Sequence, residues 1–296
     1  IPQKLTQLGV KEEDLQFLSE SAFVDLIFLI ISSIMIVVIT ALCENHMSYV
    51  ELLRLNLSVQ SLGLFVIPPF FVALLFSNHP FKYLQISYAP SFMSVLGVVV
   101  CMVVAIPFMN CIIDWNEAMH LPKALAGVES WMRESEKAAQ AMTNQILDMQ
   151  SVGGLLIVLL IVGVLAGVGE ELTFRGILQR LILDKCHNRH IAIWTAAFIF
   201  SAIHFQFYGF IPRLLLGAFF GYLLIGSGNL WLPIIAHFLN NAMTTLYTYF
   251  SKDNLFLASY ETIGTADSST AWMAWVSLAL FVFCCWGFRK YLFSRY

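Results

Sequence analysis

The sequence predicts an all-α fold, a polytopic transmembrane helical bundle of about eight spans. Of its 296 residues, 59% are hydrophobic and only 12% are charged, and the mean hydropathy is +0.77. A soluble domain of this length could not bury that much apolar surface. The apolar residues are also gathered into runs, several of which have the ~20 residues that a helix needs to cross a bilayer. We expect residues 1–296 to form a single integral membrane domain.

The expected spans are apolar runs separated by polar stretches. In order, they cover about 22–43, 57–77, 91–113, 153–175, 191–208, 213–227, 230–250 and 271–290. Pro68 and Pro69 predict a kink in the second run, which is tolerated where neighbouring helices cover the freed backbone groups. The fourth run continues as a polar-faced helix to about Leu183. The fifth and sixth runs are short, and a connection at 208–213 that contains Gly and Pro joins them, so we expect them to surround an interior cavity.

The loop between the third and fourth runs, residues 114–152, is predicted to form an amphipathic helix. Apolar residues recur in it every three or four positions, with charged residues such as Glu129 and Arg133 between them. This helix either lies on the membrane surface or caps the bundle, and we expect it to carry no chemistry.

Charged and sulfur-containing residues exclude several classes of function. The net charge is −3 and there is no basic stripe, so we expect no nucleic-acid partner. The six cysteines are scattered without a CxxC pattern, and no HExxH is present, which predicts buried thiols and neither a metal site nor a cofactor. Lys and Arg are more numerous in the expected loops on the side of the two termini, which favours a multi-pass protein with both termini in the cytoplasm.

The most informative stretch is residues 169–176, which places three charges inside the fourth apolar run. Ionisable side chains in a membrane span cost roughly 2.5–3.5 kcal/mol each on insertion scales, so they are usually functional. Glu171 and Arg175 have the spacing of an ion pair on one helix face, and we expect this pair to support the site structurally. Glu170 lies about 100° around the helix and faces a different neighbour.

Two more polar groups interrupt later apolar runs. His204 lies in the fifth run, and His237 and Asn241 share one helix face in the seventh. At ~1.5 Å per residue Glu170 and His204 lie about 20 Å from the short 184–190 loop, and His237 and Asn241 roughly 9 and 15 Å from the same face. We therefore expect all four to meet in one cavity nearer the cytoplasmic side. A lone intramembrane His or Asn is often only a hydrogen bond between helices, but each buried polar group has its own cost, and four converging on one place favour function.

Several chemistries fit these four groups. A carboxylate and a neutral His activate water as a general base, while a second His and an Asn amide donate to a developing oxyanion. That combination predicts a hydrolase of acyl bonds without a covalent nucleophile. The alternative is a metal held by the same His and Glu side chains, with a bound water that attacks.

The ordered motifs Glu170-Glu171-x-x-x-Arg175, Phe200-x-x-x-His204 and His237-x-x-x-Asn241 resemble the signatures of the CAAX-protease and bacteriocin-processing family. Its members are intramembrane glutamate-dependent endopeptidases related to the Ras-converting CAAX endopeptidase. The resemblance covers about residues 153–250.

This resemblance implies an eight-helix core with a cavity open to the cytoplasm. Glu170 would activate the water with help from His204, and His237 and Asn241 would form the oxyanion hole. Glu171 and Arg175 would shape and support the site. Eukaryotic relatives cut after a prenylated cysteine in a C-terminal CAAX box, whereas bacterial relatives are linked to bacteriocin maturation or immunity.

The expected function is therefore an intramembrane endopeptidase that acts on peptide or protein tails at the bilayer, with or without a lipid group. Two other classes compete with it. A non-catalytic receptor or immunity protein would bind a peptide in the same pocket without turnover. A proton-coupled transporter would use Glu170, Glu171 and the histidines as a relay, but the sequence lacks an inverted repeat.

Overall fold

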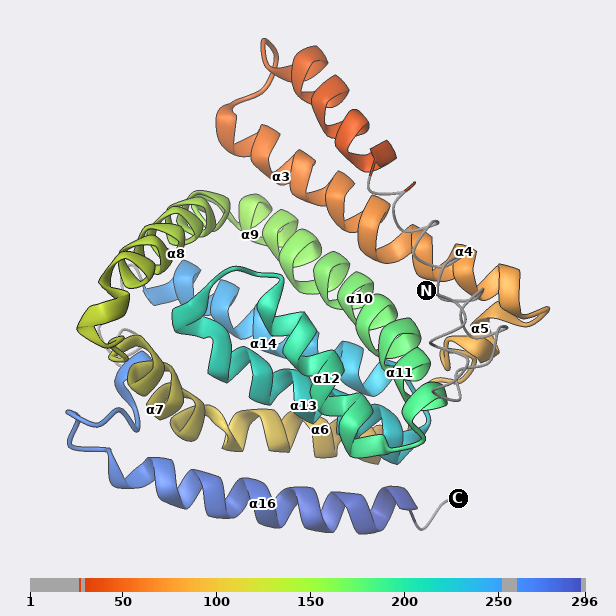
Figure 1. The fold of residues 1–296 in the computed structure, drawn as a ribbon, viewed down its shortest axis with the longest axis vertical. Coiled ribbons are helices and arrows are strands. Elements are labelled where there is room, and N and C mark those ends of the chain that lie inside the picture. The colour runs from red at the N-terminus through yellow and green to blue at the C-terminus, as the bar shows by residue number, and fades with distance from the viewer. Residues whose placement is uncertain (1–26, 28–29, 252–259, 294–296) are drawn as a thin grey trace.

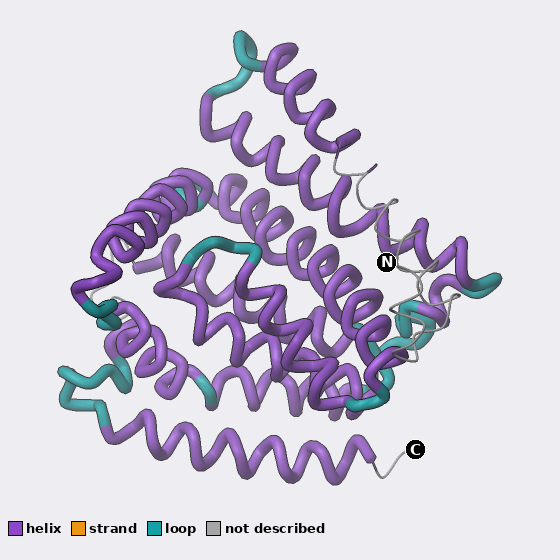
Figure 2. The backbone as a smooth tube through the Cα atoms, viewed as in Figure 1, coloured by secondary structure: helices purple, strands orange, loops and turns teal. Residues whose placement is uncertain are grey.

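The protein is an all-α helical membrane-type protein, and this confirms the predicted fold class. The computed structural model describes residues 27, 30–251 and 260–293, and no β-strand occurs among them. Figure 1 and Figure 2 show a central group of helices flanked at one edge by α16 and at the opposite edge by the helices before residue 77.

The helices follow the predicted runs closely. An N-terminal helix covers Ile30–Cys43. It is followed by α3 (Tyr49–Gln60), α4 (Ile67–Phe76), α5 (Pro80–Tyr83), α6 (Phe92–Val104), α7 (Ile106–Glu117), α8 (Ala126–Ile146), α9 (Val152–Val158), α10 (Ala166–Glu171), α11 (Gln179–Cys186), α12 (Arg189–Ala202), α13 (Phe210–Ser227), α14 (Trp231–Phe250) and α16 (Trp272–Phe293).

The helix at Tyr49–Phe76 begins with a capping box, in which Ser48 and Glu51 satisfy each other's backbone N–H groups. It continues through the two prolines, and a π-helical turn, Ser61–Val66, lies directly before them. Pro69 has no N–H to donate to the Phe65 carbonyl, which accepts a bond from the Thr173 hydroxyl at 3.1 Å instead. The carbonyl that Pro69 leaves free therefore forms a hydrogen bond between this helix and the segment that carries Glu170 and Glu171.

The third predicted span is broken. Where the sequence predicts one run over 91–113, the structure has α6 and α7 meeting at a 46° bend. Pro107 lies in the first turn of α7, where its missing N–H and fixed φ are compatible with a helix start but not with an unbroken helix.

The fourth run forms a helix from Val152 to Cys186, 35 residues long, as predicted. It contains two π-helical turns, Leu159–Leu165 and Leu172–Leu178, separated by α10. Such turns widen a helix locally and often occur at functional sites. Here they flank the short segment that ends in Glu170 and Glu171.

The prediction of an apolar helix over 191–208 is wrong in its second half. Helix α12 ends at Ala202, and a turn with Phe205 at φ 52° leads to a 3₁₀ turn over Phe207–Gly209. Asn188 caps the start of α12 by accepting from the N–H groups of His190 and Ile191. His204 therefore lies in the turn after the helix rather than inside it.

Three helices are long and apolar enough to cross a membrane: Tyr49–Phe76, Val152–Cys186 and Phe207–Ser227. The bent pair Phe92–Glu117 forms a fourth if it is counted as one span, and Ile30–Cys43 and Trp272–Phe288 are shorter apolar helices among the described residues. The total of about eight spans and the cytoplasmic termini stay predictions.

The predicted amphipathic helix is present as α8, and none of its residues is fully buried. It contacts α3 on one side and the 3₁₀ turn at Phe207–Gly209 on the other, at the rim of the bundle in Figure 1. The core lies deeper, where α4, α10–α11, α13 and α14 meet around buried side chains such as Leu172, Leu224 and Leu230.

Candidate active site

The centre of the site is a buried chain of charged and polar groups that joins two helices. The Arg175 guanidinium donates from Nη1 to Oε1 of Glu171 at 2.7 Å, and both side chains are fully buried. His237 on α14 approaches the same oxygen with Nδ1, also at 2.7 Å. The expected ion pair is therefore present, and His237 extends it across to the second helix.

Arg175 is held on every side by its surroundings. Its Nη2 donates to the Gly217 carbonyl at 3.0 Å, and the guanidinium carbon lies 4.6 Å from the centre of the Phe200 ring and 5.4 Å from that of Phe220. A β-carbon at Gly217 would lie 3.1 Å from Nη2, so glycine is what allows α13 to approach this closely. Cation–π contacts partly replace the water that this buried charge has lost.

Glu170 occupies a different environment from its neighbour. Its side chain retains 18% exposure, whereas that of Glu171 has none. Oε2 of Glu170 lies 3.7 Å from Nε2 of His237, which is longer than a direct hydrogen bond. Of the two carboxylates, Glu170 is thus the one that solvent or a substrate can reach.

The His237 ring lies between the two carboxylates and is fixed by aromatic neighbours. The Phe220 ring stacks on it at 5.3 Å with an interplanar angle of 27°, and Phe200 meets it edge-on at 5.9 Å. Because Glu171 is already paired with Arg175 as a carboxylate, Nδ1 of His237 is the donor toward it. The Nε2 atom, which faces Glu170, can then donate a hydrogen bond only when both ring nitrogens carry protons.

His204 reaches the site from the turn after α12. Its Nδ1 lies 2.8 Å from the Phe200 carbonyl, which can only accept, so Nδ1 carries the proton and Nε2 of the neutral ring is the basic nitrogen. The Phe200 ring packs against both histidines, at 5.2 Å from His204 and 5.9 Å from His237. The structure therefore brings the two histidines to either side of Phe200 without a direct hydrogen bond between them.

Asn241 lies one turn beyond His237 on α14, as its spacing predicts. Its Nδ2 donates to the Val162 carbonyl at 2.8 Å, inside the π-helical turn Leu159–Leu165. Asn240 donates in turn to Oδ1 of Asn241 at 3.2 Å, which orients the amide. One N–H of the Asn241 amide is therefore committed to structure, and the other is available to a ligand.

Arg213 is a charged residue near the site that the sequence analysis did not single out. Its Nη2 donates to Oε1 of Gln206 at 2.8 Å, while Nη1 is buried and has no hydrogen-bond partner among the described residues. Arg175 contacts Gly217, and one turn further on Gln179 contacts Gly221, so α13 and the glutamate helix run in matched register.

One turn before Gly217, this register places Arg213 level with Glu171 and Glu170. The Arg213 charge is close enough to interact with Glu170. The signal in the sequence was an arginine in the first turn of an otherwise apolar run, the same signal that identified the glutamates.

The turn that carries His204 is held from outside by two other elements. Glu136 on α8 accepts from the Tyr208 backbone N–H at 3.2 Å and from Gln206 at 3.4 Å. Asn116 at the end of α7 accepts from the Ile211 N–H at 2.9 Å and donates to the Phe207 carbonyl at 3.3 Å. These hydrogen bonds therefore connect the surface helix α8 to the turn that positions His204.

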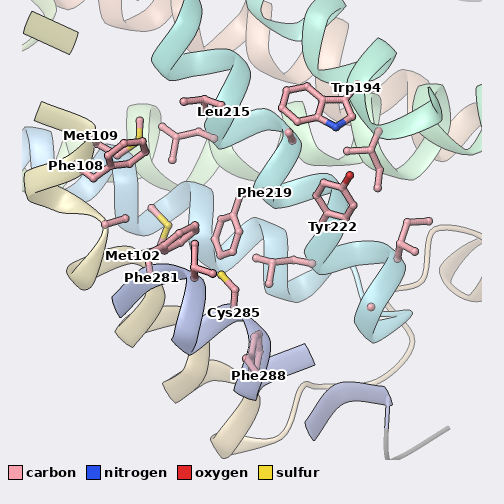
Figure 3. A pocket seen from close by; sticks show the side chains of 18 of the residues that line it. Met102, Phe108, Met109, Trp194, Leu215, Phe219, Tyr222, Phe281, Cys285 and Phe288 are labelled. Atoms are coloured by element: carbon pink, nitrogen blue, oxygen red, sulfur yellow. The ribbon is translucent and has the colours of Figure 1, made fainter. Parts of the chain in front are cut away.

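No group of three or more His, Cys, Asp or Glu side chains is arranged to hold a metal ion among the residues that the structure describes. The zinc alternative thus has no ligand set in this part of the chain. A cavity of about 620 Å³ lies on the opposite face of α13 and is lined by other residues; Figure 3 shows these residues.

Comparison with known proteins identifies the segment that carries these motifs. Residues 152–243 match the family model described as type II CAAX prenyl endopeptidase Rce1-like. The uncharacterized protein YpbD of Bacillus subtilis (strain 168) is 35% identical over 83 residues, which are 27% of this chain and 39% of that protein. No solved structure matches. Over residues 152–243 the chain is therefore similar to the Rce1-like type II CAAX prenyl endopeptidases.

Proposed function

We propose that this protein is an intramembrane endopeptidase in which Glu170 activates a water molecule. One observation carries the proposal: Glu170 is partly exposed and faces His237, while the adjacent Glu171 is fully buried and neutralised by Arg175. Two neighbouring carboxylates in such different environments take different roles. Glu171 positions His237, and Glu170 is available to react.

In the proposed reaction, Glu170 removes a proton from water as the water oxygen attacks the carbonyl carbon of the scissile peptide bond. His204 assists by accepting a hydrogen bond from the same water at its basic Nε2. The C–N bond then breaks, and the proton held by Glu170 passes to the leaving amine. No covalent intermediate forms with the protein.

The negative charge that develops on the carbonyl oxygen must be stabilised by hydrogen-bond donors. We assign this role to the second N–H of Asn241 and to Nε2 of His237 in its doubly protonated form, with a carboxylate on each side of that ring. Removing one such donor from an oxyanion hole costs about 10²–10³ in kcat. The Arg213 guanidinium, whose Nη1 is buried without a partner among the described residues, adds a positive charge to the same region.

The proposed substrate is a peptide or protein tail presented at the lipid bilayer, with or without a lipid group. The family model refers to CAAX prenyl endopeptidases, so a prenylated cysteine is the first substrate to test. In the proposed arrangement the whole chain is one multi-pass membrane domain with cytoplasmic termini and no cofactor.

The decisive experiment is cleavage of a quenched peptide library, with and without farnesyl-cysteine, by purified wild type, Glu170→Gln and His204→Ala. Glu134→Gln, an exposed change on α8, is the matched control. We expect Glu170→Gln to lower the rate of cleavage about 10²–10⁴-fold, the usual contribution of a general base. Folding of each variant is checked by gel filtration in detergent.

A chelator arm separates the two possible chemistries. Cleavage that survives the chelator supports the glutamate mechanism, whereas cleavage abolished by chelator and restored by zinc would make Glu170, His204 and His237 metal ligands. Unchanged cleavage by folded Glu170→Gln would disprove the proposal. Peptide binding without turnover in the wild type would favour the receptor alternative.

A further inference from the structure

A cavity lies beside the candidate active site and is not part of it. It has a volume of about 620 Å³ and is bounded by α6, α7, α12, α13 and α16. We call it the lateral groove; its main lining residues are Met102, Phe108, Trp194, Leu215, Phe219 and Phe281. Figure 3 shows these side chains pointing into a shared space between the helices.

Helix α13 separates the groove from the active site. Gly217 and Gly221 face Arg175 and Gln179 on the site side. Phe219 and Tyr222 line the groove on the other side. The groove is therefore a separate feature, and no residue assigned to the reaction borders it.

The groove has one polar end. Arg189 and His190, in the first turn of α12, border it there, and the Tyr222 hydroxyl lies 2.7 Å from Nδ1 of His190. No Asp or Glu is among the lining residues. The Arg189 cation in the first turn of α12 adds to the positive end of the helix dipole, an arrangement that favours an anion at this position.

The dimensions suit a single hydrocarbon chain. From Leu215 to Ile225, the part of α13 that lines the groove, the helix rises about 15 Å at 1.5 Å per residue. The cavity volume falls within the roughly 300–1,000 Å³ of ordinary small-ligand sites. A ligand that fits is therefore long, apolar and anionic at one end.

A peptide does not meet these requirements. Apart from Arg189, His190, Tyr222 and the Trp194 indole N–H, the lining side chains are hydrocarbon or have sulfur as their only heteroatom. A peptide backbone in the groove would leave its N–H and C=O groups without partners, at a cost of several kcal/mol per group in an apolar medium.

We propose that the lateral groove binds one anionic phospholipid, with an acyl chain between α13 and α16 and its phosphate at Arg189 and His190. The last turn of the neighbouring helix α11 also carries Lys185, on the side where the Lys and Arg count places the cytoplasm. Anionic lipids are concentrated in the cytoplasmic leaflet, and each basic residue near that surface adds to their attraction.

The test uses the full chain in detergent and native mass spectrometry with phosphatidylglycerol or phosphatidylcholine of identical acyl chains. We expect wild type to retain phosphatidylglycerol more strongly. Arg189→Gln should lower that affinity about tenfold, the effect of losing one charge-assisted hydrogen bond. Arg189→Lys should preserve most of the preference.

Two further variants test the position of the lipid. Lys185→Gln removes one charge from the last turn of α11 without touching the groove, and it should have little effect. Phe219→Trp narrows the groove and should weaken both lipids. A photoreactive acyl chain should label the α16 segment that contains Cys285, which lines the groove.

Three results would overturn the proposal. The first is equal affinity of the wild type for the two lipids. The second is an equal loss in Lys185→Gln and Arg189→Gln, which would indicate general surface attraction. The third is displacement of the lipid by a farnesylated peptide, which would assign the groove to a substrate. Since the readout is binding, it is independent of whether the proposed peptidase reaction occurs.

Discussion

The two faces of α13 are packed in different ways. Toward the glutamates, Gly217 and Gly221 let the helix approach so closely that their backbone carbonyls accept from Arg175 and Gln179. Toward α16, large side chains such as Phe219 surround a cavity of about 620 Å³. One helix thus bounds both a closely packed polar contact and an open apolar cavity.

This difference follows from what each face must satisfy. A buried charge is costly unless it is paired and hydrogen-bonded, so the helices around Arg175 lie close enough for its two Nη atoms to reach Glu171 and Gly217, while its Nε has no partner among the described residues. Apolar side chains make no such demand, and a cavity between them is stable when hydrocarbon from the bilayer fills it. The predictions below test this contrast, from the largest expected effect to the smallest.

The largest effect should come from breaking the buried ion pair. Glu171→Gln leaves Arg175 without its counter-charge and should destabilise the protein by about 3–5 kcal/mol. Thermal unfolding in detergent measures the change. The double variant Glu171→Gln with Arg175→Met removes both charges and should recover part of the loss; a double variant as unstable as the single one would contradict this reading.

The second effect concerns the close approach of α13. A β-carbon at Gly221 would lie 2.5 Å from Oε1 of Gln179 and 2.9 Å from Ile193, so Gly221→Ala should cost about 1–3 kcal/mol through overpacking. Phe219→Leu, on the groove side, borders an existing cavity and should cost less. If the two variants have the same melting temperature, the two faces do not differ in packing as we argue.

The third effect concerns the turn that carries His204. Glu136→Gln weakens the bonds to the Tyr208 N–H and to Gln206, and should destabilise the turn by about 1 kcal/mol. Hydrogen exchange over residues 203–209 should accelerate while exchange at α13 beyond Gly217 stays unchanged. Glu134→Gln on the same helix is the control, and equal acceleration in both variants would show that the coupling through Glu136 is absent.

The smallest effect lies on the surface, away from both faces of α13. Hydrogen bonds from His120, Arg133 and the Leu121 N–H lower the pKa of Glu129 to about 2. A lowered folded pKa adds stability above the unfolded value of about 4.3, and this stability is lost as the pH falls toward 2.

Exchange protection at the start of α8 should therefore fall between pH 4.3 and 2 in the wild type, with little change in Glu129→Gln. Protection that is lost at the same pH in both proteins would mean that another group is responsible.

Much of the candidate site could be predicted from spacing within a helix. The positions of Glu171 and Arg175 predicted their ion pair, and the positions of His237 and Asn241 predicted their common face. The prediction was wrong for His204, whose helix ends at Ala202. No periodicity marks that end, because the apolar run continues through residues that the structure places in a turn.

Contacts between segments far apart in the sequence could not be predicted from residue spacing. Arg213 was read as part of a connection, yet the register of α13 against the glutamate helix places it level with Glu170. The 46° bend between α6 and α7 was also missed, although Pro107 was visible in the run. A proline permits a bend, and packing against neighbouring helices determines whether one forms.

The chain alone was sufficient for the all-α membrane class and for the placement of charges in apolar runs, because these depend on local composition and on helical periodicity. It was not sufficient for which carboxylate is exposed, which atom His237 contacts, or where the lateral groove opens. Those features depend on how distant helices pack, since a side chain's burial and partners are properties of all the helices around it.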